Sequence, residues 1–310
     1  MVDKKEVKKT QVTVLIPVFE DFKCLPILLK RIEQNLHDIC NYEILIIDDG
    51  SLKNLDEKYE LVVENKVNFL TLSQNIGHQR SIAIGLCYLS EKKNIDYVLI
   101  MDGDGEDNPI DARKLLKKAN ELKRMSILFA RRDVRSEPLL FRLGYLFYRI
   151  LFRFCTGKNI KFGNFSLVPS GMLKRLTGIP ELWNHYASSV LAANIPIVEV
   201  STHRSGRIAG RPKMNLGSLV LHGISSITTF LSVFALRLLL FSSVATISII
   251  VVSTLPLTDF LPTLLTNNGI IIIWFFSSLT LNSLFFLLFA VSRRNQAPCT
   301  PSTFWRNFIN

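Results

Sequence analysis

The chain has 310 residues, of which 48% are hydrophobic and 20% are charged, and this composition excludes a disordered or low-complexity protein. The formal net charge of +11 favours anionic partners, such as phosphorylated small molecules or an acidic membrane surface. No zinc finger or aromatic RNA-binding signature accompanies the charge, so we predict no nucleic-acid partner.

The five cysteines are scattered along the chain and none forms a CxxC pair. This usage argues against a disulfide framework and indicates a reducing compartment. The apolar run from Val12 to Phe19 is too short for a secretion signal, and charged residues follow it directly. We therefore expect the N-terminal part of the chain to stay in the cytosol.

Short apolar strands alternate with amphipathic helices in the first part of the chain. The expected strands are 12–18, 43–47, 67–72, 97–101 and 127–130, and the expected helices are 26–37, 79–90 and 110–124. This alternation predicts an α/β domain with a mostly parallel sheet and helices on both faces. In such a sheet, ligands bind at the carboxyl ends of the strands.

Carboxylates are concentrated just after three of these strands: Asp21, Asp48, Asp49, Asp102 and Asp104. Gathered at one sheet edge they would repel one another, and a divalent cation would relieve the repulsion and attract phosphate oxygens. The sequence has no GxGxxG after the first strand and no GxxxxGK[ST], which disfavours dinucleotide and P-loop sites. Plain acidic turns are the alternative interpretation of these loops.

Two uncharged stretches, 238–258 and 269–291, have 21 and 23 residues. As helices they would be about 31–35 Å long, enough to cross a hydrocarbon core of about 30 Å. Arg237 before the first stretch and Arg293 and Arg294 after the second place both termini in the cytosol under the positive-inside rule. A pair of buried helices in a soluble core is the alternative.

Residues 214–230 have apolar side chains at helical spacing and predict an amphipathic helix in the membrane interface. A soluble core helix is the alternative. Residues 139–155 mix arginines with large apolar side chains and predict a second interface helix.

Five ordered segments resemble family 2 glycosyltransferases with the GT-A fold, and more narrowly the polyprenyl-phosphate branch that includes dolichol-phosphate mannosyltransferase-like enzymes and bacterial relatives with two transmembrane helices. Residues 16–21 are similar to I-P-x-Y-N-E, although Phe19 and Asp21 depart from it. Residues 48–51 match D-D-G-S, residues 75–80 resemble an N-x-G loop, and residues 101–107 match the DxD motif. Residues 203–213 look like R-x-x-R-x-x-G-x-S-K, with proline in place of serine.

The resemblance implies that Asp102 and Asp104 are catalytic and hold Mg²⁺ or Mn²⁺, with Glu106 as a further metal ligand. Such a metal would neutralise the nucleotide diphosphate as it leaves the sugar. The implied contacts to the nucleotide sugar are Pro17, Asp21, Asp48, Asp49, Asn75, Gly77 and Asp102.

The resemblance also implies that four basic residues bind the acceptor phosphate and the diphosphate: Arg131, Arg204, Arg207 and Lys213. Arg131 is further expected to take part in catalysis. For the loop residues among them, the alternative is a basic cluster attracted to acidic lipids. Residues 163–167 match G-D-F-R-L except that Asn164 replaces aspartate and Ser166 replaces arginine. Asn164 cannot act as a base, but a phosphate acceptor is already anionic at pH 7 and needs alignment more than deprotonation.

These features predict a membrane-bound, inverting, metal-dependent hexosyltransferase that moves one sugar from a nucleotide-diphosphate sugar to a polyprenyl phosphate on the cytosolic leaflet. The Q-x-x-R-W motif of processive synthases is absent, which favours a single transfer. The expected organisation is a GT-A domain (1–213), a juxtamembrane helix (214–236), two transmembrane helices (237–294) and a cytosolic tail (295–310).

Two other functions stay open at this point. One is transfer to a hydroxyl group of a lipid, which would need a base. The other is a catalytically inactive membrane scaffold that binds nucleotide sugars. Several relatives assemble as multimers, so the resemblance also leaves a homo-oligomer open.

Overall fold

The computed structural model describes residues 9–52, 67–122, 125–132, 139–202, 206–208, 216–254, 268–295 and 300–309. Contacts within the chain define two compact units. The sheet unit comprises Met1–Arg149, Asn159–Thr229 and Cys299–Asn310, and the helix-pair unit comprises Ile150–Lys158 and Phe230–Pro298.

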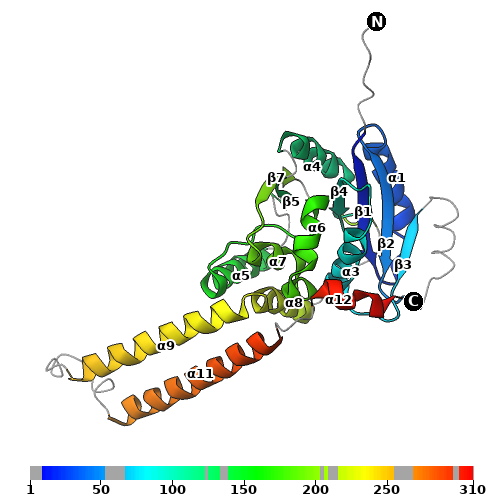
Figure 1. The fold of residues 1–310 in the computed structure, drawn as a ribbon. Coiled ribbons are helices and arrows are strands. Elements are labelled where there is room, and N and C mark those ends of the chain that lie inside the picture. The colour runs from blue at the N-terminus through cyan, green and yellow to red at the C-terminus, as the bar shows by residue number, and fades with distance from the viewer. Residues whose placement is uncertain are drawn as a thin grey trace, which may run out of the picture. The chain divides into compact units, whose positions relative to one another are not determined.

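Within the described residues, one sheet has seven strands in the order β3-β2-β1-β4-β6-β5-β7 (Figure 1). Their bounds are β1 (Gln11–Val18), β2 (Asn41–Asp48), β3 (Asn68–Thr71), β4 (Tyr97–Ile100), β5 (Ile127–Arg132), β6 (Ser166–Pro169) and β7 (Ile197–Thr202). β6 runs antiparallel to β4 and β5, and the other pairs are parallel. The prediction of a mostly parallel α/β sheet is confirmed.

Both units contain helices. In the sheet unit they are α1 (Leu25–Leu36), α3 (His78–Ser90), α4 (Pro109–Glu121), α6 (Ser170–Thr177), α7 (Tyr186–Ala192), α8 (Leu216–Thr228) and α12 (Pro301–Phe304), with 3₁₀ turns η1 (Pro180–Trp183) and η2 (Trp305–Phe308). The helix-pair unit has α9 (Leu231–Thr254) and α11 (Asn268–Asn295). α5 (Leu139–Thr156) contributes residues to both units.

Successive side chains of β1 pack against helices on opposite faces of the sheet. Val14 and Ile16 belong to a buried cluster that includes Leu28 of α1 and Leu115 of α4. The intervening Leu15 lies against α3, where its side chain packs at a glycine. Successive side chains of a strand point to opposite faces, so one apolar run serves both layers.

Two strands, β6 and β7, were not among the elements expected from the sequence. β6 has four residues and ends in Pro169, although all four are buried. Such a short segment with a proline carries little strand signal by itself, and its pairing with β4 and β5 decides its conformation.

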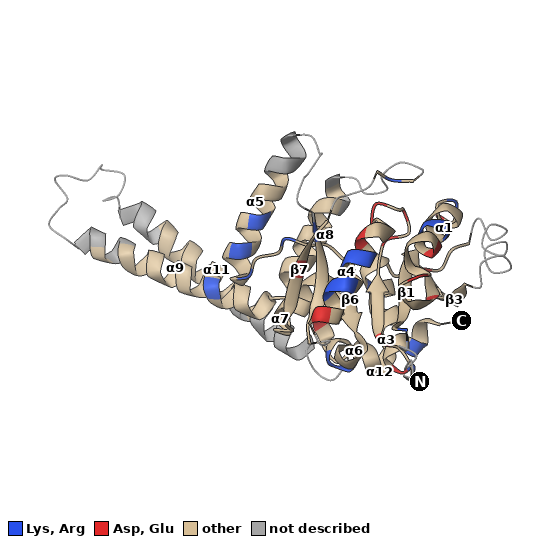
Figure 2. Cartoon of the chain, turned by 90° about the horizontal axis from the view of Figure 1, so that it is seen from above, with Lys and Arg blue, Asp and Glu red and all other residues tan. Residues whose placement is uncertain are grey.

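α9 and α11 pack side by side, and Figure 2 shows them almost without Lys, Arg, Asp or Glu in their described parts. α9 begins at Leu231, before the uncharged stretch at 238–258, and Arg237 lies inside the helix. Its guanidinium donates to the carbonyl oxygens of Phe154 at 2.9 Å and Arg153 at 3.4 Å. These carbonyls lie at the end of α5, where a cation is favoured.

Among the described residues, one helix, Leu231–Ser248, is long and apolar enough to cross a membrane. Only 11% of this stretch is buried. In α11 the stretch Ile273–Phe285 is apolar but shorter. Both transmembrane helices therefore stay predictions.

Candidate active site

The acidic loops predicted from the sequence lie at one edge of the sheet. β1 is paired in parallel with β2 on one side and with β4 on the other. The segments that follow these three strands therefore leave the sheet at the same edge. They contain Asp21, then Asp48 and Asp49, and then Asp102 and Asp104.

The Asp48-Asp49 turn holds the loop before α3. Asp48 is fully buried, and its Oδ1 accepts the backbone N–H of Ser51 at 3.1 Å. The two carboxylate oxygens of Asp49 accept the N–H groups of Ile76 at 2.8 Å and Gly77 at 2.9 Å. Burial raises the pKa of the Asp49 carboxyl, and the two N–H groups offset part of that rise.

Gly50 is required by the close approach of this loop. Its φ is +70°, and a Cβ at this position would lie 2.5 Å from the backbone carbon of Gln74. A side chain would therefore be strained and would also collide with the neighbouring backbone. The D-D-G-S and N-x-G segments thus form one packed structure.

The DxD loop is turned by two of its own carboxylates. Asp107 is buried, and its Oδ2 accepts the N–H of Asp102 at 2.9 Å. The Oδ1 of Asp104 accepts the N–H of Glu106 at 3.0 Å. The side chains of Asp102 and Asp104 are 33% and 21% exposed, so both are open to a ligand from solvent.

Arg207 joins the first, fourth and fifth motif segments. It donates to Oδ2 of Asp21 at 3.0 Å, and its Nη1 lies 3.5 Å from Oδ2 of Asp104. Ile208 follows, and its N–H donates to the carbonyl oxygen of Asp104 at 3.1 Å. Burial, together with the nearby charges of Asp102 and Glu106, raises the pKa of Asp104 despite this arginine.

Within the described part of the chain, no three His, Cys, Asp or Glu side chains converge to hold a metal alone. Two neighbouring carboxylates, Asp102 and Asp104, nevertheless fit a hard divalent cation. Mg²⁺ usually keeps several waters and is held by one or two carboxylates together with substrate phosphates. The predicted role of Glu106 as a third ligand is not tested by these contacts.

A hydrogen-bonded chain that the sequence did not reveal runs towards Asp102. The N–H of Tyr186 donates to Oε1 of Gln79 at 2.8 Å, and Nε2 of Gln79 donates to Oδ1 of Asn164 at 3.2 Å. Nδ2 of Asn164 lies 3.1 Å from Nε2 of His78, which lies 3.2 Å from Oδ1 of Asp102.

The hydrogen bonds of Gln79 fix the orientation of the Asn164 amide. A backbone N–H can only donate, so the Gln79 amide must present its oxygen to Tyr186 and its nitrogen to Asn164. The Nδ2 group of Asn164 then faces Nε2 of His78. This ring nitrogen accepts from Asn164 when it carries no proton, and donates to Asp102 when it carries one.

A pair of histidines connects α7 with α8. Nδ1 of His185 accepts the N–H of Ser188 at 3.2 Å and caps α7, and its Nε2 lies 3.3 Å from Nε2 of His222. One proton must lie between the two Nε2 atoms, and a second would place two N–H groups face to face. Burial lowers the pKa of His185 to about 3 and also lowers that of His222, so the pair is neutral.

The remaining predicted site residues lie in different settings. Nη1 of Arg131 pairs with Oε2 of Glu199 at 3.2 Å, and Pro17 is buried at the end of β1. Asn75 is exposed in the loop before α3. Arg204 and Lys213 lie outside the described residues. Of the four predicted phosphate-binding residues, Arg207 has described contacts with the acidic loops.

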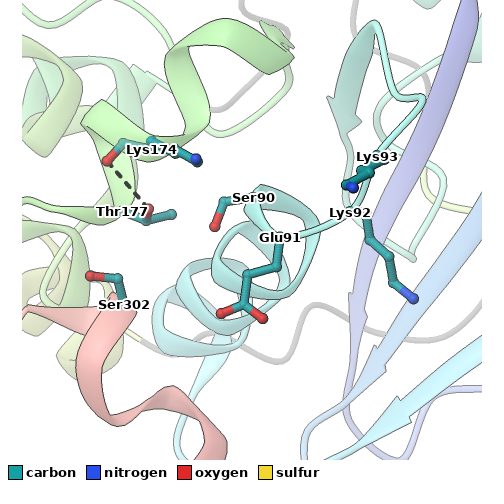
Figure 3. A pocket seen from close by; sticks show the side chains of 7 residues that line it. All are labelled: Ser90, Glu91, Lys92, Lys93, Lys174, Thr177 and Ser302. Atoms are coloured by element: carbon teal, nitrogen blue, oxygen red, sulfur yellow. Dashed lines mark hydrogen bonds between the residues drawn. The ribbon is translucent and has the colours of Figure 1, made fainter.

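A cavity of about 480 Å³ lies at the far end of α3 (Figure 3). It is lined by Ser90, Glu91, Lys92, Lys93, Lys174, Thr177 and Ser302. His78 begins α3 and Ser90 ends it, so about 18 Å of helix separates this cavity from the DxD loop. It is therefore distinct from the acidic edge.

The model of the family described as Glycosyl transferase family 2 matches residues 13–176, more than half of the chain. The chain belongs to glycosyl transferase family 2. It is a glycosyltransferase, and the matched region contains the first four motif segments and Asn164.

Similar proteins agree with this assignment. The undecaprenyl-phosphate 4-deoxy-4-formamido-L-arabinose transferase of Salmonella choleraesuis is 28% identical over 257 residues, covering 77% of this chain and 72% of that protein. The transferase of the same name from Yersinia enterocolitica is 26% identical over 254 residues, with the same coverage of 77% and 72%.

Solved structures share the fold. Glucosyl-3-phosphoglycerate synthase from Mycobacterium tuberculosis, in complex with Mn²⁺, UDP-glucose and phosphoglyceric acid, superposes with a TM-score of 0.55 at 14% identity. The match covers 73% of this chain and 79% of that one. The predicted GT-A-like sheet of this glycosyltransferase is thereby supported at the level of fold.

Proposed function

We propose that this glycosyltransferase moves one sugar from a nucleotide-diphosphate sugar to the phosphate of a polyprenol at the cytosolic face of a membrane. The single observation that carries the proposal is the meeting of Asp21, Asp104 and Arg207 at the acidic edge of the sheet. Carboxylates and a guanidinium at one place suit a reaction between two phosphate-bearing substrates.

The donor would lie over the loops that follow β1, β2 and β4. Asp49 organises residues 76–77, Asn75 lies in the same loop, and Asp21 lies in the loop that follows β1. Asp102 and Asp104 would hold the divalent cation, which supplies electrostatic stabilisation of the departing diphosphate. The Mycobacterium tuberculosis synthase contains Mn²⁺ together with UDP-glucose, which supports a metal of this kind here.

The acceptor phosphate would be aligned by basic groups. Among the described residues the candidates are Arg207 and Arg131. Arg204 and Lys213 are the other two residues that the sequence predicts for this role. One acceptor oxygen attacks the anomeric carbon, the bond from that carbon to the diphosphate oxygen breaks, and the nucleoside diphosphate leaves. Attack opposite the leaving group inverts the anomeric centre. Asn164 does not take up a proton, and an anionic phosphate does not require it to. The names of the undecaprenyl-phosphate transferases support this acceptor class.

Exposed apolar side chains support a membrane location. Phe147 of α5 is 68% exposed and Leu221 of α8 is 67% exposed, and these helices are joined by a 2.6 Å hydrogen bond between Tyr148 and Ser226. Helices with such faces insert into the membrane interface. α9 and α11 would cross the bilayer, with both termini in the cytosol.

The test uses purified enzyme in lipid nanodiscs with Mg²⁺ or Mn²⁺ and a panel of UDP-, GDP- and CDP-sugars. We expect one donor to give a glycosylated polyprenyl phosphate and a free nucleoside diphosphate. Diacylglycerol and ceramide serve as hydroxyl acceptors in parallel reactions. Transfer to these alone would overturn the phosphate acceptor, and absence of transfer from every donor would favour a scaffold.

A further inference from the structure

Residues 300–309 belong to the sheet unit and lie along α3. Figure 1 shows α12 next to α3 and β3. Trp305 is 4% exposed, and its ring packs edge-to-face on Tyr88 of α3 with centroids 6.0 Å apart. Arg306 pairs with Glu91 at 2.5 Å, just after α3 ends. The segment thus makes specific contacts at the carboxyl end of this helix.

An aromatic cluster extends the contact to the other end of α3. The rings of Phe304 and Phe308 lie 4.8 and 5.2 Å from the ring of Trp183 in η1. The guanidinium of Arg80, in the first turn of α3, stacks over the same indole at 5.4 Å. Stacking of this kind contributes beyond the burial of the rings.

Backbone contacts bring the segment to the loop before α3. The N–H of Ser73 donates to the carbonyl oxygen of Phe308 at 2.9 Å, and Leu72 and Ile309 form an antiparallel bridge. The N–H of Leu72 donates to the carbonyl oxygen of Asp48 at 2.8 Å. Residues 72–77 are therefore held by Asp48 and Asp49 on one side and by residues 308–309 on the other.

We propose that residues 300–309 form a positioning element of the donor site, which holds residues 72–77 in the conformation that receives a nucleoside diphosphate. This inference rests on the proposed function. Residues 73–77 form neither helix nor strand, and such loops open easily unless they are tied down. The segment touches the loop at Leu72 and Ser73, and so acts on the donor without contacting it.

The test compares Phe308→Ala with wild type and with Ser302→Ala, a change on the same segment at the wall of the cavity rather than at the loop. We expect Phe308→Ala to raise the donor KM and the Kd for the bound nucleotide about tenfold, with kcat within about twofold, because a less ordered loop lowers the population of the binding-competent state. The probe is whichever of UDP, GDP and CDP wild type binds with Mn²⁺. Phe308→Tyr, which keeps the ring, should restore the wild-type KM.

Hydrogen exchange provides a readout that does not depend on turnover. The amides of Ile76 and Gly77 should exchange faster in Phe308→Ala, while those of β1 and β4 stay unchanged. Equal KM and equal exchange in Phe308→Ala and wild type would overturn the inference and leave glycosyl transfer standing. A uniform loss of protection with an unchanged KM would also overturn it, since the segment would then be only structural. If wild type binds no nucleotide, the proposed donor chemistry fails, whereas the exchange comparison still decides whether the segment holds the loop.

Discussion

The two units of the molecule place polar and apolar side chains in opposite ways. In the sheet unit, Val14 and Ile16 are fully buried and charged side chains lie at the edge. In the helix-pair unit, Ile247 is 60% exposed and Leu287 is 61% exposed, whereas Ser242 and Ser278 are 6% and 8% exposed. Ser242 and Ser278 thus lie between the two helices, whereas Ile247 and Leu287 lie outside.

The contrast agrees with the proposed membrane location of the helix-pair unit. Between α9 and α11, Thr246 and Ser278 share a hydrogen bond at 2.6 Å, and Ser242 donates to Asn282. Small and polar residues at a helix–helix contact, with apolar residues outside, are typical of helices in lipid. Water instead favours the arrangement of the sheet unit, because apolar burial dominates its stability.

The largest expected effect is a loss of turnover on substitution in the sheet unit but not in the helix-pair unit. Asp104→Asn should lower turnover by about 10²–10³-fold, because a neutral amide replaces one of the two charged groups expected to hold the metal. Ser242→Ala between the helices should leave turnover near wild type. Steady-state kinetics with saturating donor measures both, and turnover unaffected by Asp104→Asn would contradict the metal-binding role.

A matched pair of exposed isoleucines tests whether the two units face different solvents. Ile247 on α9 and Ile110 on α4 are 60% and 51% exposed. Ile247→Lys should cost about 3 kcal/mol of membrane insertion, whereas Ile110→Lys should change stability by no more than about 0.5 kcal/mol. Membrane fractionation and glycosylation-tag mapping measure insertion. Equal behaviour of the two variants would argue for the soluble helix pair instead.

A matched pair of glycines tests the packing of the acidic edge. Gly50→Ala should destabilise the protein by about 1–3 kcal/mol, because of its positive φ and the nearby Gln74 backbone. At Gly171 on α6 a Cβ would meet no atom within 4 Å, so Gly171→Ala should be neutral or stabilising by up to about 1 kcal/mol. Denaturant unfolding compares them, and an equally mild Gly50→Ala would show that the turn tolerates a side chain.

The smallest effect concerns the His185–His222 pair. The folded pKa of His185 is lowered to about 3, so between that value and its ordinary value of 6.5 the unfolded chain binds more protons. The stabilising contribution is full above pH 6.5 and decreases as pH falls, by about 1–2 kcal/mol by pH 5. His185→Asn keeps an acceptor for the N–H of Ser188 and should flatten this part of the stability profile. An unchanged slope in that variant would assign the pH dependence to other groups.

Much of the core of the fold was predictable because its signals are local. The apolar runs at residues 12–18 and 43–47 and the helical spacing at residues 26–37 correspond to β1, β2 and α1. The strand-end carboxylates could be placed at one edge because parallel strands share their carboxyl ends. β6, by contrast, depends on its neighbours, and a four-residue window does not contain them.

The sequence by itself determined the strand–helix alternation, the order of the acidic motifs and the two uncharged stretches, because each is a pattern within a short window. Only the tertiary structure brought Arg207 to Asp21, connected Asn164 with His78 and seated residues 300–309 beside α3, where the sequence had predicted only a tail. These partners are far apart along the chain, and the packing of the sheet and its helices decides which of them meet.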